Sequence, residues 1–304
     1  MKKILSGALW LTIICVMSCN VAQGQIEKLL ANGAVVKKVA DGFKFTEGPV
    51  SDAMGNVYFT DQPNNQILKY SMEGELSVFH KGSGRANGMY FSPDEKLVAC
   101  ADEDNELWVF EMDGSHTVRL SGQEGSHFNG PNDLWIDPDG GIFFTDPLYK
   151  RPWWEGRRSA EMEKEGQYVY YLAKGSKTPI AIETSLKQPN GIFGIVSAKT
   201  LFVADIGDGK TYKYSYQEDG TLSDRALFAD MGSDGMTADR KGNVYLTGKK
   251  GVTVFNKKGQ EIGVIAIPAN WTANVCFGGK DMKTLFITSM DGLYAVEMKV
   301  KGLR

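Results

Sequence analysis

The sequence predicts an all-β fold, a six-bladed β-propeller whose four-stranded blades surround a central channel. One polar residue recurs six times in register at the start of an apolar run, at intervals of 40, 45, 58, 44 and 40 residues. Those six positions are Glu47, Asn87, Asn132, Asn190, Asp234 and Asn274. A period of about 40 residues that carries several short strands is typical of a propeller blade, and six such units can close into a ring. The polar positions would then converge on one axis.

The first repeat shows the four strands of a blade most clearly. Strand-like runs cover residues 48–51, 57–60, 66–70 and 76–79, and turn-forming residues separate them. Turn signals recur in the later repeats at Pro93-Asp94, Asp113-Gly114, Pro138-Asp139-Gly140, Asp219-Gly220, Lys241-Gly242-Asn243, Lys258-Gly259 and Asp291-Gly292. Residues 25–45 are apolar enough to supply a closing strand, because propellers commonly join both ends of the chain in one blade to protect the last sheet edges.

The first 24 residues predict a secretory signal peptide. The basic start Met1-Lys2-Lys3 precedes an apolar stretch over residues 4–17, a pattern that matches a signal peptide rather than a membrane span. Val16-Met17-Ser18-Cys19 resembles a lipoprotein processing site, with Cys19 as the lipidated N-terminus, whereas Ala22-Gln23-Gly24 would serve ordinary cleavage. We therefore expect an exported protein, periplasmic or secreted. Both cleavage sites remain open, and in the first alternative Cys19 anchors the protein to a membrane surface.

Residues 25–304 form one propeller domain in this interpretation. The chain has 304 residues with 42% hydrophobic content, 35 Gly and 10 Pro, so it can bury a large core and make many turns. No Pro/Ser-rich or charged linker interrupts the repeats. The formal net charge is −3 and no basic run occurs, which argues against nucleic acid as a partner. Nothing in the sequence indicates an obligate protein partner.

Two of the four cysteines, Cys100 and Cys276, lie outside the signal segment. Both belong to apolar strand patterns, in repeats two and six, and those blades are not neighbours in a six-membered ring. We expect buried free thiols rather than a disulfide or a metal site.

The third repeat is longer than the others because it contains an insertion from about residue 147 to residue 167. The insertion carries large aromatic and cationic side chains: Trp153, Trp154, Arg157 and Arg158. Beside a propeller mouth such a segment could form a lid or a substrate wall. The alternative is a surface loop whose tryptophans pack on an adjacent blade.

Four of the recurring residues would point into the channel from one end if each innermost strand begins there. They are Glu47, Asn132, Asn190 and Asp234. This oxygen cluster has a formal charge of −2 and lacks thiolate and imidazole, a donor set that suits Ca²⁺ or Mg²⁺. A loose cage drawn from four blades suits Ca²⁺ better, because Ca²⁺ tolerates irregular geometry and more ligands. The alternative is that these residues cap turns between blades.

Four short motifs resemble the gluconolactonase/regucalcin family of lactone hydrolases. They are Thr46-Glu47-Gly48-Pro49, the pair Phe128-Asn129-Gly130-Pro131-Asn132-Asp133 and Phe144-Thr145-Asp146-Pro147, then Gln188-Pro189-Asn190-Gly191 and Ser233-Asp234-Gly235-Met236. Each is weakly specific alone, but all four occur in order and at blade spacing over residues 43–298.

The resemblance implies a six-bladed propeller with one divalent metal ion in the channel. The ion would be Ca²⁺ before Mg²⁺, Mn²⁺ or Zn²⁺. Glu47, Asn190 and Asp234 would be metal ligands, and Asn132 would be a fourth ligand or a water-linked substrate contact. Asn87, within Arg85-Ala86-Asn87-Gly88, resembles a substrate-facing position. Arg85 of the same motif is a second candidate substrate contact. Asn274 would be structural.

Two departures from related patterns limit what the resemblance implies. His127 stands where many such lactonases have Lys or Arg, so recognition of the sugar acid differs here, and His127 itself becomes a candidate substrate contact. The related diisopropyl fluorophosphatases carry an acid three residues after the metal-binding Asp, whereas this chain has Thr237. That weakens a phosphotriesterase interpretation.

The predicted activity is metal-dependent opening of a sugar lactone, with Asp234 as the catalytic base. Three histidines, His80, His116 and His127, make a zinc triad a poor alternative. The chain lacks a Gly-x-Ser-x-Gly elbow and nucleotide-binding loops, which excludes the usual serine hydrolases and nucleotide enzymes. The remaining alternative is a non-catalytic propeller that binds a ligand or partner and uses Ca²⁺ structurally.

Overall fold

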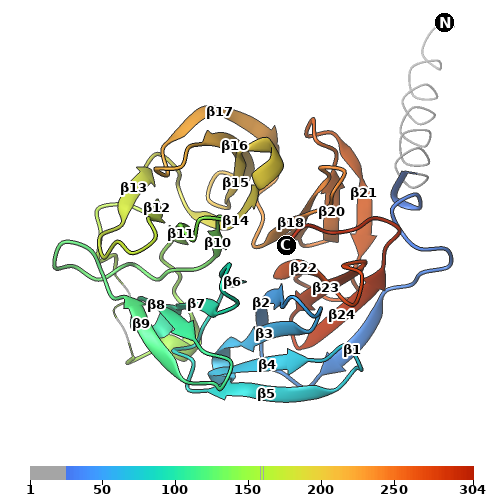
Figure 1. The fold of residues 1–304 in the computed structure, drawn as a ribbon, viewed down its shortest axis with the longest axis horizontal. Helices are drawn as coiled ribbons and strands as arrows, with labels where there is room; N and C mark the ends of the chain where they lie inside the picture. The colour runs from blue at the N-terminus through green and yellow to red at the C-terminus, as the bar shows by residue number, and fades with distance from the viewer. Residues whose placement is uncertain (1–24, 158, 160) are drawn as a thin grey trace, which may run out of the picture.

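The structure, a computed structural model, describes residues 25–157, 159 and 161–304, and over these it confirms the predicted fold. Six four-stranded antiparallel sheets stand around a common axis as the blades of a propeller (Figure 1). The expected signal segment with Cys19, and Arg158 of the insertion, lie outside the described residues. Within the described part of the chain, no helix has both the length and the apolar character needed to cross a membrane.

Each blade has the same strand order from the channel outward. The innermost strands are β2 (Thr46–Ser51), β6 (Met89–Phe91), β10 (Leu134–Ile136), β14 (Pro189–Ile195), β18 (Met236–Ala238) and β22 (Asn274–Gly278). The second strands are β3 (Val57–Asp61), β7 (Leu97–Ala101), β11 (Ile142–Asp146), β15 (Thr200–Asp205), β19 (Val244–Gly248) and β23 (Thr284–Ser289). The third strands are β4 (Gln66–Tyr70), β8 (Glu106–Phe110), β12 (Tyr168–Leu172), β16 (Lys210–Tyr216), β20 (Gly251–Phe255) and β24 (Gly292–Glu297). The outermost strands are β5 (Leu76–Lys81), β9 (His116–Leu120), β13 (Ile180–Glu183), β17 (Leu222–Ala229), β21 (Glu261–Ala266) and β1 (Lys37–Asp41). Short 3-10 helices lie in the loops: η1 (Gln62–Asn64), η2 (Asp102–Asp104), η3 (Pro152–Trp154) and η4 (Val196–Ala198).

The ring closes between the two ends of the chain. β1 pairs antiparallel with β24, with Lys37 opposite Ala295 and Asp41 opposite Gly292. The closing strand predicted within residues 25–45 is therefore confirmed, and it covers a sheet edge that would otherwise stay unpaired. At the centre, β2 packs against both β6 and β22, so the innermost strands form a continuous ring.

In three blades a buried aspartate ends the second strand, 14 or 15 residues after the recurring polar residue of the same blade. Asp61, Asp146 and Asp205 each accept backbone N–H groups from the segment that leads into the innermost strand of the same blade. Asp205, for example, accepts the N–H of Gln188 at 2.9 Å, two residues before Asn190. Each carboxylate therefore fixes the backbone just ahead of a recurring polar position.

Aromatic side chains fill the space between neighbouring blades. The Trp135 ring lies 5.4 Å from that of Tyr216, joining blades three and four, and the Tyr245 ring lies 5.2 Å from that of Phe277, joining blades five and six. Cys100 and Cys276 are buried and free, as predicted.

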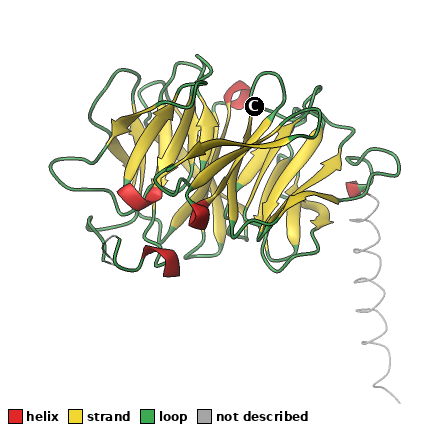
Figure 2. Ribbon diagram, turned by 90° about the horizontal axis from the view of Figure 1, so that it is seen from below, coloured by secondary structure: helices red, strands yellow, loops and turns green. Residues whose placement is uncertain are grey.

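The C-terminal residues close one end of the channel. The Leu303 N–H donates to the Ala238 carbonyl at 2.8 Å, and Arg304 pairs with Glu95 at 2.7 Å. Figure 1 places the C-terminus at the centre of the ring, and Figure 2 shows it on one face. η1 follows Asp61, which pairs with Thr46 at the start of β2. Arg304, in contrast, contacts Ser51 at the end of β2, so η1 lies on the opposite face. We call the opposite end of the channel, on the face that carries η1, η2 and η3, the accessible end or mouth, because the C-terminal residues do not cover it.

Candidate active site

The structure brings Glu47, Asn190 and Asp234 together at the accessible end of the channel. All three are buried, with at most 8% of each residue's surface exposed. The Asn190 amide donates to Asp234 Oδ1 at 2.8 Å, and the Asp234 charge reaches Glu47 strongly enough to raise its pKa. Asn132 is also buried and belongs to the same ring, since its carbonyl accepts the Gly88 N–H at 2.7 Å.

Glycines that follow the recurring polar residues allow neighbouring blades to approach this closely. A Cβ on Gly48 would lie 2.1 Å from the backbone oxygen of Asn87 in the next blade. A Cβ on Gly235 would lie 2.0 Å from the side chain of Asn274. Any larger residue would push the strands apart, so the Glu-Gly and Asp-Gly pairs of the motifs are needed to draw the polar side chains onto one axis.

Burial controls the protonation of the two carboxyl groups. It raises the pKa of Glu47 well above its ordinary range, and the Asp234 charge raises that pKa further, whereas the Gly48 N–H and the Arg151 charge oppose the rise. Burial also raises the pKa of Asp234, against the lowering effects of Arg151, Trp271 and Asn190. In the protein alone, the two carboxylates are therefore a poorly compensated pair of negative charges.

A divalent cation fits this arrangement. Asn190 Oδ1 is buried and accepts no hydrogen bond, an acceptor that a cation would use. The same cation would neutralise Glu47 and Asp234. Asn132 leaves its Nδ2 without a partner, and a half-turn of the amide would present Oδ1 instead. Among the described residues, no three His, Cys, Asp or Glu side chains lie close enough together to hold a metal ion. A cation here would therefore rely on amide oxygens beside two carboxylates.

The insertion over residues 147–167 joins β11 to β12 and crosses the accessible end of the channel. At its start, the Tyr149 hydroxyl accepts the Asn190 amide at 2.6 Å. Farther along, the Trp153 ring lies 6.0 Å from that of Phe45, which precedes β2 two blades away. Arg157 pairs with Glu103 of the blade between them at 3.1 Å. The insertion is thus both a wall of the mouth and a segment packed on other blades.

The structure does not bring the other two predicted substrate contacts to the mouth. Arg85 is held by Glu103 at 3.1 Å, off the line of a hydrogen bond, and by backbone carbonyls of residues 62 and 63. Those contacts hold its guanidinium against neighbouring loops, and its substrate role stays a prediction. His127 is exposed, and no hydrogen bond or ring contact joins it to the site among the described residues. Asn87 does face the ring, with a buried and unpaired Nδ2.

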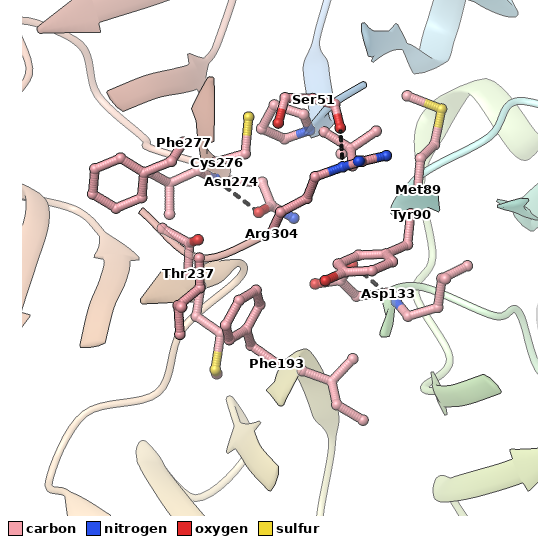
Figure 3. A pocket seen from close by; sticks show the side chains of 18 residues that line it. Ser51, Met89, Tyr90, Asp133, Phe193, Thr237, Asn274, Cys276, Phe277 and Arg304 are labelled. Atoms are coloured by element: carbon pink, nitrogen blue, oxygen red, sulfur yellow. Dashed lines mark hydrogen bonds between the residues drawn. The ribbon is translucent and has the colours of Figure 1, made fainter. Parts of the chain in front are cut away.

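A cavity of about 40 Å³ lies inside the channel behind the polar ring (Figure 3). Asp133 and Asn274 line it, together with Tyr90 and Arg304. Asp133 accepts the Leu134 N–H at 3.0 Å, Asn274 accepts the Val275 N–H at 2.7 Å, and burial raises the pKa of Asp133 to about 8. Asn274 thus lies in the interior of the channel, behind the polar ring.

Three residues at the mouth were not predicted from the sequence: Tyr149, Arg151 and Trp271. The Trp271 indole donates to Asp234 Oδ2 at 2.8 Å, and Arg151 lowers the pKa of both carboxyl groups. None of the three shares the repeat position, so periodicity gave no signal. The nearest signal was the aromatic and cationic composition of the insertion, which pointed to its tryptophans and later arginines instead.

Comparison with known proteins places these residues in a family context. The profile described as the SMP-30/Gluconolactonase/LRE-like region matches residues 45–291. A gluconolactonase of Zymomonas mobilis is 28% identical over 307 residues, which cover 91% of this chain and 85% of that protein.

Two solved structures share the whole fold. A crystal structure described as a candidate gluconolactonase, from a structural genomics consortium, is 31% identical with a TM-score of 0.85 and covers 92% of this chain and 97% of its own. A gluconolactonase of Xanthomonas campestris is 26% identical with a TM-score of 0.83, covering 90% of this chain and 92% of its own.

Proposed function

The chain belongs to the SMP-30/gluconolactonase/LRE-like family, and we propose that it is a lactone hydrolase that opens a sugar lactone at a divalent cation in the mouth of its channel. The similarity to the Zymomonas and Xanthomonas gluconolactonases supports the lactone as substrate. Support for the cation comes from the residues of the site itself.

One observation carries the proposal of a cation. Two buried carboxyl groups, Glu47 and Asp234, lie beside a buried amide oxygen of Asn190 that accepts no hydrogen bond. Such a group of acceptors is unfavourable in a protein interior unless a cation or protons compensate it. Glu47, Asn190 and Asp234 would hold the ion, and Asn132 would be a fourth ligand or a water-linked substrate contact. Oxygen donors alone favour Ca²⁺ over Zn²⁺, with Mg²⁺ and Mn²⁺ between them.

Asp234 is the candidate base. Trp271 and Asn190 each donate to its carboxylate at 2.8 Å, which fixes its direction. A cation bound to Asp234 would lower its pKa, so its suitability as the base rests on this fixed position rather than on unusual basicity. In the proposed step Asp234 takes a proton from water, the water oxygen bonds to the lactone carbonyl carbon, and the ring C–O bond then breaks as the ring oxygen takes up a proton.

The amides around the mouth serve the substrate. Asn87 and Asn132 each keep a buried Nδ2 donor without an acceptor, and these donors suit the hydroxyl and carbonyl oxygens of a sugar lactone. When bound, a divalent cation would polarise the lactone carbonyl and offset the negative charge that develops on its oxygen.

The experiment measures proton release from gluconolactone by the purified protein after EDTA treatment and after addition of Ca²⁺. We expect hydrolysis that EDTA abolishes and Ca²⁺ restores. Hydrolysis that EDTA leaves unchanged would reject the cation but keep the lactonase. No hydrolysis across a panel of lactones would favour the alternative, a non-catalytic propeller that binds a ligand and uses Ca²⁺ structurally.

Export is part of the proposal and rests on residues 1–24 alone. Fractionation of the producing cell, with detergent partitioning of the fraction that contains the protein, tests it. Recovery outside the cytoplasm is expected, and partitioning into detergent that Cys19→Ala removes would identify the lipid anchor.

A further inference from the structure

The insertion presents one cation to the mouth in an unusual way. The Arg151 guanidinium lies over four aromatic rings, 4.8 Å from Tyr149, 5.5 Å from Trp154, 5.6 Å from Trp153 and 5.7 Å from Phe45. Cation–π contacts of this kind fix the position of a guanidinium without using its N–H donors. Arg151 is therefore held in place while its hydrogen-bonding capacity stays free.

The donors of Arg151 have no acceptor in the described part of the chain. Its Nε is buried without a hydrogen-bond partner, and no carboxylate lies within ion-pair distance of the guanidinium there. Its charge nevertheless acts on both Glu47 and Asp234. An arginine whose buried Nε is unpaired costs free energy unless something binds it, and guanidinium groups match carboxylates in a two-pronged geometry.

Other unpaired donors lie in the ring of recurring polar residues and in the insertion. Asn87 Nδ2, Asn132 Nδ2 and Trp153 Nε1 are buried and lack acceptors. They come from three separate segments, so a shared ligand that supplies oxygen acceptors explains them together. The hydroxyl groups of a sugar lactone suit the amides and the indole, whereas a carboxylate is the group that best matches the charge and the planar donors of a guanidinium.

Charge balance leads to the same conclusion. A divalent cation between Glu47 and Asp234 would cancel their two negative charges, and Arg151 would leave the mouth with a formal charge of +1. A neutral lactone would leave that charge uncompensated in a partly desolvated site, whereas a lactone with its own carboxylate would neutralise it.

We propose that Arg151 is the specificity-determining residue of this site and that the preferred substrate is a sugar lactone with a free carboxylate, such as the monolactone of an aldaric acid. This inference rests on the proposed lactonase function. Arg151 binds the carboxylate, and the carboxylate orients the lactone ring toward Asp234. The reaction remains hydrolysis, in which water adds to the carbonyl carbon, the ring C–O bond breaks and a second carboxylate forms.

The test compares kcat/KM for glucarolactone, which is anionic, with that for gluconolactone, which is neutral, in the Ca²⁺-supplemented protein. We expect the wild type to prefer glucarolactone by at least about tenfold. Arg151→Met should lower kcat/KM for glucarolactone by at least about tenfold more than it lowers kcat/KM for gluconolactone. Arg151→Lys should lie between them, because lysine keeps the charge but loses the planar fork.

Arg225→Met is the matched control. Arg225 also lies over a ring, 4.1 Å from that of Tyr212, but on the outermost strand of blade four. Arg225→Met should leave kcat/KM for both lactones unchanged. Raising the salt concentration should increase KM for glucarolactone in the wild type and not in Arg151→Met, a response that a merely structural role would not produce.

Three outcomes decide whether Arg151 sets a preference for an anionic lactone. Equal wild-type kcat/KM for the two lactones, or equal losses on both in Arg151→Met, would overturn the inference and leave the lactonase intact. No hydrolysis of either lactone by the wild type would overturn the proposed function itself. If the variant fails to fold, the wild-type preference and its salt dependence still decide the inference.

Discussion

The two ends of the channel are built from the same six innermost strands, yet they hold their polar groups differently. At the closed end, Arg304 pairs with Glu95 and donates to the Ser51 carbonyl at 3.2 Å. At the accessible end, Glu47 and Asp234 lie together with raised pKa values, and Arg151 and several amides keep unpaired donors. Buried charges and hydrogen-bond donors without partners therefore gather at the accessible end of the channel. The difference implies that changes at the accessible end remove activity, whereas changes at the closed end affect stability alone.

The largest effect is expected from Asp234→Asn at the accessible end. The variant keeps the shape and the Trp271 contact but removes the negative charge and the base. We expect kcat for lactone hydrolysis to fall by about 10²–10⁴-fold with little change in the melting temperature. The exposed turn residue Asp219 provides the control, because Asp219→Asn should be neutral. Activity of Asp234→Asn within a few fold of the wild type would reject its assignment as the base.

Glu47→Gln should separate ion binding from folding. Glutamine can still accept the Gly48 N–H, which Glu47 accepts at 3.0 Å, but it removes one of two negative charges. We expect Ca²⁺ to bind about 10- to 100-fold more weakly, measured by calorimetry. Added Ca²⁺ should restore part of the activity at millimolar concentration. Unchanged Ca²⁺ affinity would place the ion elsewhere.

The effect of pH on the rise in Tm that Ca²⁺ causes tests the charge state of Glu47 and Asp234. Because burial raises the pKa of Glu47 and Asp234 above their ordinary values of 4.5 and 3.8, the folded ion-free protein retains protons that the unfolded chain has lost. Its stability therefore falls as pH rises above that range. A cation favours the ionised pair, so the increase in Tm on adding Ca²⁺ should be at least about 2 °C larger at pH 8 than at pH 5. An equal shift at both pH values would contradict this assignment.

Asp205→Asn tests the link between the second strands and the mouth. Asp205 accepts the Lys187 and Gln188 N–H groups at 2.9 Å each, just before Asn190. Loss of these charge-assisted bonds should cost about 1–3 kcal/mol of unfolding free energy and reduce kcat several-fold, because Asn190 becomes less well positioned. Denaturant titration and steady-state kinetics measure the two effects. A variant with full stability and activity would mean that the spacing has no positioning role.

The smallest effect is expected at the closed end. Arg304→Ala removes a partly exposed ion pair with Glu95 and should lower the unfolding free energy by about 0.2–1 kcal/mol. Lactone turnover should stay within twofold of the wild type. A large loss of activity would show that the two ends are coupled, against the separation described above.

The repeat made most of the fold predictable from the sequence. Each blade buries its strands against its neighbours, so strand positions, the closing strand and the buried Cys100 and Cys276 all follow one period. The residues that meet on the axis, Glu47, Asn190 and Asp234, share that period and were predicted for the same reason.

What escaped prediction lies outside the period. Arg151 and Tyr149 reach the mouth because the insertion crosses to other blades, a path that no local pattern encodes. The resemblance, and not the repeat, suggested Arg85 and His127. In the structure Glu103 and neighbouring loops hold the side chain of Arg85, and His127 lies exposed in a loop. Side-chain direction at these positions depends on non-local partners, so spacing alone could not decide it.

The central claim is that Glu47, Asn190 and Asp234 share one divalent cation. A crystal structure of the protein grown with Ca²⁺ tests it most directly. The account predicts a single ion on the channel axis, with oxygens of all three side chains about 2.3–2.6 Å away. An empty mouth at millimolar Ca²⁺, with Asp234 still hydrogen-bonded to Asn190 alone and to Trp271, would contradict it.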